Sequence, residues 1–233
     1  MLKVEALHTH YGRAHILAGV SLEVKAGEVV VLLGRNGAGK STTMKSIMGL
    51  ARPTAGSVEF QGRRIDRLAP YRIARLGLGY VPEERRIFTE LTVLENLEVG
   101  RQAPRAGAPT WDFGRIGEIF PNLREMPQRP GGRMSGGEQQ MLTIARTLMG
   151  NPSCVLLDEP SEGVAPVIVD QMAEAIRGLK AAGVAILLSE QNLHFALAVA
   201  DRAYIIEKGA IRFDGSVAQL RADRQVQAQY LAV

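Results

Sequence analysis

The sequence predicts an α/β fold in which an N-terminal antiparallel sheet precedes a largely parallel sheet that holds an inserted helical segment. Uninterrupted apolar runs at 29–33, 153–157 and 184–188 show no alternation, which is typical of parallel strands covered on both faces. Residues 3–7 and 20–24 alternate between apolar and polar side chains, which is typical of strands with one exposed face. The antiparallel sheet is therefore expected first along the chain.

The elements that follow are predicted from their end signals. A helix is expected over 40–48, because Gly49 supplies a stop directly after it. Strands are expected at 57–60, which a Gln-Gly turn follows, and at 78–81, which Pro82 ends. These short elements connect the first buried strand, at 29–33, to the helical segment that begins at about 88.

Helical patterns dominate the segment from about 88 to 150, around a loop at 101–109 that is rich in Pro, Gly and Ala. A further helix is expected over 167–181, where Gly183 ends it before the next buried strand. The sequence contains no internal repeat. We therefore interpret residues 1–233 as one domain with a helical subdomain inserted at about 88–150.

Composition narrows the classes of function. The chain has 233 residues, 46% of them hydrophobic, so it is long and apolar enough for a sizeable core. Its net charge of +4 is spread over the chain, which is weak support for binding nucleic acid, and none is expected as a partner. No apolar run approaches the roughly 18 residues of a spanning helix, and the N-terminus lacks a signal-peptide layout. A cytoplasmic protein without a membrane span is expected, with Cys154 as a small core residue.

A glycine-rich loop directly follows the first buried strand. It has the pattern G-x-x-x-x-G-K-[ST] and consists of Gly34, Arg35, Asn36, Gly37, Ala38, Gly39, Lys40, Ser41 and Thr42. Glycines let successive N–H groups point inward, and the following helix adds its positive end, so the loop can hold phosphates. Lys40 is expected to reach the β- and γ-phosphates and Ser41 to ligate Mg²⁺. The alternative, a glycine-rich turn with a solvated lysine, does not explain the strand before and the helix after.

Two carboxylates end the second buried strand. Asp158 is expected beside the phosphate loop, because parallel strands of such folds present their carboxyl ends to the ligand. We expect Asp158 to coordinate Mg²⁺ through water and Glu159 to polarise the water that attacks the γ-phosphate. The alternative is an acidic pair that caps the next element.

A third motif precedes a helical pattern at about 141–148. Ser135 is a good N-cap residue, and Glu138 completes a capping box. The motif therefore has an ordinary interpretation as a well-capped amphipathic helix. Gly136 and Gly137 also leave bare N–H groups at the helix start, which indicates a second phosphate site.

Together, GRNGAGKST, CVLLDEP and MSGGEQQ resemble the Walker A, Walker B and signature sequences of ABC-type ATPases, and the resemblance covers essentially the whole chain. It implies a P-loop NTPase fold of the ABC nucleotide-binding type, with ATP and Mg²⁺ as cofactors and ATP hydrolysis as the activity. It also implies head-to-tail pairing, in which the signature helix of one subunit covers ATP held by the other. Tyr11 matches the aromatic residue that stacks on adenine; the alternative is a strand residue packed on the core.

Several segments resemble a narrower branch, the smaller ATPase of branched-chain amino acid uptake systems. These segments are 79–83, 85–88, 91–97, 159–166 and 189–192. Relatives that import urea or short amides look much alike, so the substrate stays open between these groups.

Three positions depart from the general ABC pattern. Glu83 stands where most members have the Q-loop glutamine, Gln191 where they have the switch histidine, and Ala165 where they have an aspartate after Walker B. Glu83 can still meet Mg²⁺ through an oxygen. Gln191 can still hydrogen-bond the γ-phosphate or the attacking water, and we count it among the catalytic residues, although it does not titrate near pH 7. His194 is expected on the surface, on another face from Gln191 if 191–200 is helical.

The resemblance implies an ATP-hydrolysing subunit of an importer at the cytoplasmic face of the inner membrane. Its expected partners are membrane-spanning permease subunits and a second ATPase, which makes a heterodimer in the cell, whereas the isolated chain can pair with itself. The region 80–88 and the helical insertion would dock a permease helix, although Ile87 and Phe88 beside basic residues are also compatible with ordinary packing. The alternatives are a lipid-export ATPase and a soluble ABC ATPase of DNA repair or translation, which normally carries a coiled coil or fused domains.

Overall fold

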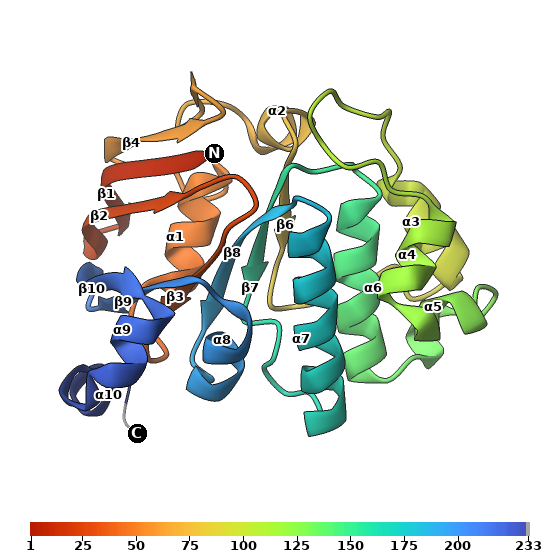
Figure 1. Ribbon diagram of the computed structural model, residues 1–233. Coiled ribbons are helices and arrows are strands. Elements are labelled where there is room, and N and C mark those ends of the chain that lie inside the picture. Colours follow the sequence, from red (N-terminus) through yellow and green to blue (C-terminus); the bar gives the residue numbers. More distant parts are fainter. Residues whose placement is uncertain (232–233) are drawn as a thin grey trace.

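The computed structural model describes residues 1–231 and contains two β-sheets (Figure 1). The larger sheet has the order β10 (Ala210–Ser216), β9 (Arg202–Glu207), β3 (Val29–Leu33), β8 (Ala185–Glu190), β7 (Cys154–Asp158) and β6 (Leu78–Val81). β10 pairs antiparallel with β9, and all other neighbours pair parallel. Parallel pairing brings the carboxyl ends of β3, β7 and β8 to one edge of the sheet.

The smaller sheet is antiparallel, is built from strands near the N-terminus and lies at the upper left in Figure 1. Its order is β2 (Ala14–Val24), β1 (Leu2–Tyr11), β4 (Ala55–Phe60) and β5 (Arg63–Arg64). β1 and β2 run beyond the alternating segments seen in the sequence, with register shifts along β1 between Val4 and Leu7. Ala6 has φ 44° within this irregular stretch, which breaks the alternation that sequence patterns detect.

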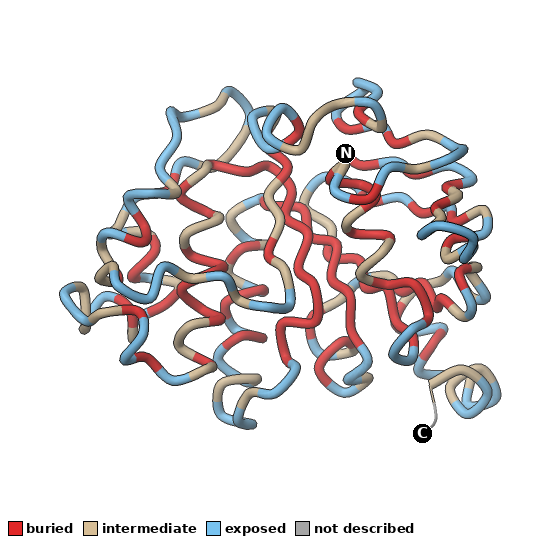
Figure 2. The backbone as a smooth tube through the Cα atoms, turned by 180° about the vertical axis from the view of Figure 1, so that it is seen from behind, coloured by how far each residue is buried: buried red, intermediate tan, exposed pale blue. Residues whose placement is uncertain are grey.

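Alternate residues of the central strands divide between two cores. In β3, Val29, Val31 and Leu33 pack with the helices on one face. Val30 and Leu32 pack with the smaller sheet and with α1 (Lys40–Ile47) on the other face. Figure 2 shows the central strands buried along their length. Burial on both faces is why these strands read as unbroken apolar runs.

Helices fill the chain between β6 and β7. They are α3 (Val93–Gly100), α4 (Phe113–Ile119), α5 (Pro121–Glu125), the 3₁₀ turn η1 (Gly131–Arg133) and α6 (Gly136–Leu148). The remaining helices are α2 (Pro70–Arg75), α7 (Pro166–Ala181), α8 (Leu193–Val199), α9 (Val217–Ala222) and α10 (Arg224–Tyr230). No helix or strand occurs between Arg101 and Asp112, where the sequence predicts a loop.

The α/β fold with an N-terminal antiparallel sheet is confirmed, and most helix ends lie within a residue of their predicted places. α1 ends at Ile47 and Gly49 follows with φ 69°. α7 begins one residue earlier than expected, since Pro166 fixes a helical φ at the first position. α8 begins at Leu193 and not at 191, because Asn192 caps it through Phe195 N–H, so Gln191 precedes the helix. His194 is exposed on α8, as expected.

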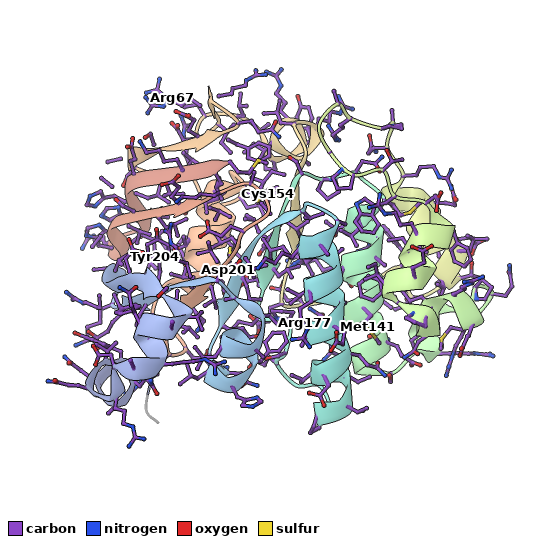
Figure 3. All side chains as sticks on the ribbon, in the orientation of Figure 1. Arg67, Met141, Cys154, Arg177, Asp201 and Tyr204 are labelled. Carbon is purple, nitrogen blue, oxygen red and sulfur yellow. The ribbon has the colours of Figure 1, made fainter. Side chains whose placement is uncertain are left out.

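Cys154 is buried at the start of β7, which confirms its role as a core residue (Figure 3). Its side chain belongs to the core shared with the smaller sheet. Burial raises the pKa of its thiol to about 12, so the thiolate is disfavoured. No helix within residues 1–231 is both long and apolar enough to cross a membrane.

Candidate functional site

The glycine-rich loop connects β3 to α1 at the carboxyl edge of the larger sheet. Gly37 and Gly39 have φ 78° and 114°, a region that glycine adopts without strain. A Cβ on Gly34 would lie 2.5 Å from the carbonyl oxygen of Ile206, so this position is sterically restricted to glycine. The loop backbone and the N-terminus of α1 therefore form the phosphate-holding geometry that the sequence predicts.

Lys40 folds back over this loop and is buried, with 3% of the residue exposed. Its Nζ donates to the carbonyl oxygens of Gly34 at 2.6 Å and Arg35 at 3.1 Å. The same ammonium group forms an ion pair with Glu159 Oε1 at 3.1 Å. A cation and a carboxylate, both shielded from water, therefore meet at the mouth of the loop.

Asp158 ends β7 and accepts three side-chain hydrogen bonds. Ser41 Oγ donates to its Oδ1 at 3.1 Å, and Ser189 Oγ donates to the same oxygen at 2.6 Å. Tyr80 OH donates to Oδ2 at 3.2 Å. Burial raises the pKa of Asp158, and these hydrogen bonds oppose that rise. Ser41 and Asp158 thus bring two hard oxygen atoms together beside the phosphate loop.

Glu159 adopts a left-handed conformation, with φ 46°, directly after the strand. Its N–H donates to Ser189 O and Ser189 Oγ, both at 3.1 Å, which fixes this conformation. Gln191 Nε2 donates to Glu159 Oε2 at 3.1 Å. The three residues that the sequence assigns to catalysis, Lys40, Glu159 and Gln191, therefore lie in one connected cluster.

A cavity of about 240 Å³ opens over this cluster. Its lining residues are Tyr11, Ile16, Gly37, Gly39, Lys40, Ser41, Thr42 and Glu159. Tyr11 ends β1 and is 51% exposed, so it is not packed in the core as the alternative interpretation required. The cavity joins an exposed aromatic ring to the phosphate loop, which is the arrangement that a nucleotide base and its phosphates need.

Two further carboxylates face the cluster. Partial burial, with the negative charges of Glu159 and Asp158, raises the pKa of Glu83. A hydrogen bond with Glu159, partial burial and the charge of Glu83 raise the pKa of Glu162 to about 7. Several carboxylates therefore lie close together where phosphates and a metal ion would bind.

Replacing Glu162 with glutamine is expected to stabilise the empty protein at pH 8 but not at pH 5. The pKa of Glu162 is higher in the folded chain than its ordinary 4.5, so the folded state is favoured by protonation and loses stability as pH rises between these two values. Glutamine keeps the hydrogen bond without this penalty. The side chain is largely exposed, so a modest gain of roughly 2 °C in melting temperature is expected at pH 8.

Melting curves between pH 5 and pH 8 test this expectation. Glu118→Gln, at an exposed position of α4, serves as the matched control. A gain that is equal at both ends of the pH range would show that the charge of Glu162 is not its cause.

The signature residues lie apart from this cluster within one chain. Ser135 caps α6 by the predicted capping box, with Ser135 N–H donating to Glu138 Oε2 at 2.7 Å. A Cβ on Gly136 would meet the guanidinium of Arg85, and one on Gly137 would meet Ile168. α6 and α1 pack on opposite faces of the larger sheet. The structure therefore does not bring Ser135, Gly136 or Gly137 to the phosphate loop of their own chain.

Sequence reasoning missed four residues at this site: Tyr80, Ser189, Glu190 and Glu162. Ser189 and Glu190 end β8, and their position offered a signal, because polar residues that close a buried parallel strand lie at the ligand edge. Tyr80 was assigned only to the docking region, yet its hydroxyl group also binds Asp158. Glu162 follows Glu159 by three residues, which was a signal of their proximity, and the turn between them is closed by Glu162 N–H donating to Glu159 O at 3.1 Å.

The fold and this site together define a P-loop ATPase domain. A family model described as "ABC transporter" matches residues 17–162. The high-affinity branched-chain amino acid transport ATP-binding protein BraG of Pseudomonas aeruginosa is 42% identical over 231 residues, with 99% of each chain covered. The lipopolysaccharide export system ATP-binding protein LptB of Haemophilus influenzae is 36% identical, covering 99% of this chain and 97% of that protein.

Among solved structures, an ATP-binding cassette of an ABC transporter in its ADP conformation matches with a TM-score of 0.83. It is 29% identical and covers 98% of this chain and 97% of its own. The chain belongs to the ABC transporter family. It is an ATP-hydrolysing enzyme, and its resemblance to the ATPases of amino acid uptake systems is confirmed.

Proposed function

We propose that this ABC ATPase powers uptake of branched-chain or related hydrophobic amino acids. The observation that carries the proposal is the 42% identity to BraG over almost the full length of both chains. Import of urea or short amides is the first alternative. The 36% identity to LptB keeps lipid export as the second.

The proposed chemistry assigns a role to each member of the cluster. Tyr11 stacks on adenine, and the loop Gly34–Thr42 binds the phosphates through its backbone N–H groups. Lys40 leaves Glu159 to stabilise negative charge on the β- and γ-phosphates. Glu159 then accepts a proton from the attacking water, and Gln191 orients that water or the carboxylate.

Mg²⁺ fits the oxygen donors at this point. Ser41 Oγ and Asp158 Oδ1 are 3.1 Å apart, and Glu83 supplies a further carboxylate nearby. Within residues 1–231 no group of three or more His, Cys, Asp or Glu side chains could hold a metal ion by itself. Mg²⁺ usually binds through one or two carboxylates together with substrate phosphates, so this sparse set is suitable. When bound, the ion neutralises charge on the phosphate oxygens.

Two subunits are proposed to share each ATP. The support is that Ser135, Gly136 and Gly137 lie on the face opposite α1, so they need a second chain to meet a phosphate loop. Bound ATP would hold the two subunits together, and loss of the γ-phosphate would release them. The partner is proposed to be a different ATPase in the cell, whereas the isolated chain can pair with itself.

A groove of about 640 Å³ beside β6 is the proposed site for a permease helix. Tyr71, Tyr80, Phe88 and Val99 contribute to its lining, and Arg146 places its guanidinium over the Phe88 ring. Ile87 packs against the core instead, so only part of the expected 80–88 surface is available. Exposed aromatic and aliphatic side chains around a hollow are typical of a protein-docking surface.

The domain proposal follows from this arrangement. Residues 1–233 are proposed to form one ATP-binding domain, in which the helical subdomain at about 88–150 contains the signature helix α6 and part of the lining of the groove. Residues 232 and 233 lie outside the described residues. The chain is proposed to sit at the cytoplasmic face of the inner membrane through its permease partners.

Affinity purification of the tagged chain from its native membranes, with identification of the bound proteins, tests the transport proposal. Two permease subunits and a second ATPase are expected, with ATPase activity stimulated by an amino-acid-loaded binding protein. Stimulation by urea-loaded binding protein or by lipopolysaccharide would establish one of the alternatives. A chain that hydrolyses ATP but purifies alone would contradict the transport assignment.

A matched pair of variants tests the groove. Val99→Glu is expected to reduce the recovered permease at least about tenfold, because it places a charge on the apolar lining. Leu50→Glu is the control, since both side chains are 54% exposed and only Val99 lines the groove. Equal recovery with the two variants would exclude the groove as the docking site.

A further inference from the structure

Glu190 is a buried carboxylate that the proposed chemistry does not use. It ends β8, and only 1% of the residue is exposed. Within residues 1–231 no lysine, arginine or histidine forms an ion pair with it. An ionised carboxylate in such a place must be stabilised by hydrogen bonds, so the partners of Glu190 define its role.

Those partners are backbone N–H groups of two separate loops. Oε1 accepts from Ser161 N–H at 3.1 Å, in the loop that follows Glu159. Oε2 accepts from the N–H groups of Gln191 and Asn192, both at 3.2 Å, in the connection between β8 and α8. One side chain therefore joins the loop that follows Glu159 to the connection that carries Gln191.

The backbone of Glu190 adds a third connection. Its carbonyl oxygen accepts from Gly34 N–H at 3.3 Å, at the start of the phosphate loop. The carboxylate thus lies where the ends of β3, β7 and β8 meet. A residue in this place can fix the relative positions of the loops that these strands carry.

Gln191 depends on such support, because it is exposed and lies outside any helix. Its amide reaches Glu159 Oε2 at 3.1 Å only while the backbone at 191–192 keeps its present course. Glu190 and the cap that Asn192 provides to α8 are the contacts that hold this backbone.

We infer that Glu190 is a positioning residue that keeps the amide of Gln191 on Glu159 by holding the loops at 161 and 191–192 together. The inference rests on the proposed roles of Glu159 and Gln191 in ATP hydrolysis. Glu190 itself is not among the residues that line the cavity over the phosphate loop.

Glu190→Gln tests this inference with little change in volume. The amide has one accepting oxygen, and its NH₂ group would face an N–H group of one loop, so the two loops cannot both stay bonded. The expected result is a fall in kcat of roughly ten- to a hundredfold, since small displacements of catalytic groups have effects of this size. The KM for MgATP is expected to stay within about twofold, because the contacts of Lys40 and the phosphate loop remain.

A double-mutant cycle distinguishes positioning from a general structural role. In a Gln191→Ala background the added Glu190→Gln change is expected to alter kcat less than about twofold, because its target is already absent. Equal losses of kcat in both backgrounds, a raised KM with unchanged kcat, or wild-type turnover would each overturn the inference. If Glu190→Gln does not fold, Glu190→Asp keeps the charge but shortens the reach, and the same cycle applies.

Two control variants distinguish a failure of this inference from a failure of the proposed role of Glu159. Asp66→Asn alters another carboxylate that accepts a backbone N–H, from Val58 at 3.3 Å, and is expected to leave kcat unchanged. Glu159→Gln is measured in parallel. If Glu159→Gln abolishes turnover while Glu190→Gln keeps the wild-type kcat, this inference alone fails; if Glu159→Gln retains turnover, the proposed function of Glu159 fails.

Discussion

Glu159→Gln is expected to lower ATP turnover about a hundredfold or more while ATP still binds. The substitution removes the proton acceptor but keeps one oxygen that can accept a hydrogen bond from Lys40. In the unsubstituted chain, Lys40 Nζ lies 3.1 Å from Glu159 Oε1. It also removes negative charge from the wall of the cavity, so the phosphates of ATP meet less repulsion. Steady-state hydrolysis and equilibrium binding of a fluorescent ATP analogue measure the two effects.

The same variant should accumulate as a dimer when ATP and Mg²⁺ are present, because the γ-phosphate that we propose to hold the subunits together is not removed. Light scattering after size-exclusion chromatography measures the mass. Glu118→Gln is the control, and it is expected to hydrolyse ATP and to behave as the wild-type chain does. Turnover in Glu159→Gln at the wild-type rate would show that another group accepts the proton.

Lys40→Met is expected to have the second large effect, on ATP binding and stability together. Methionine occupies a similar volume but leaves the Glu159 carboxylate buried without its cation, and the carbonyl groups of Gly34 and Arg35 lose their donor. Breaking one side of a buried ion pair costs about 3–5 kcal/mol of unfolding free energy. ATP affinity is expected to fall at least about tenfold, because the phosphates lose the positive charge of the Lys40 ammonium group.

Urea denaturation of the single and double variants of Lys40 and Glu159 measures the loss in free energy of unfolding. Lys40→Met with Glu159→Gln should recover most of the lost stability, since a neutral amide costs less to bury than an unpaired carboxylate. ATP binding should stay weak in both variants. Lys180→Met is the matched control, because its ion pair with Asp201 at 2.5 Å is partly exposed and such pairs contribute at most about 1 kcal/mol. Equal losses for Lys40→Met and Lys180→Met would contradict the argument.

The parts of the fold that the sequence predicted are those governed by local chemistry. Unbroken apolar runs identified β3, β7 and β8, because burial on both faces leaves no position for a polar residue. Capping chemistry identified the start of α6, where Ser135 and Glu138 bond each other's backbone.

The contacts missed from the sequence depend on which strand ends lie side by side. Tyr80 and Ser189 reach Asp158 only because β6 and β8 flank β7. Chain order does not determine this, since β8 follows β7 whereas β6 precedes it by more than seventy residues. The extent of β1 was also underestimated, because its irregular register hides the alternation.

Tyr80 has a consequence for how events outside the ATP site reach it. Tyr80 lines the groove that we propose for docking, while its hydroxyl group donates to Asp158 at 3.2 Å. An occupant of the groove that turns the Tyr80 ring therefore breaks a hydrogen bond of the carboxylate, which keeps only Ser41 and Ser189 among its described side-chain donors. The groove and the carboxylate are joined by one tyrosine side chain, so binding in the groove can change the surroundings of Asp158 directly, without intermediate residues.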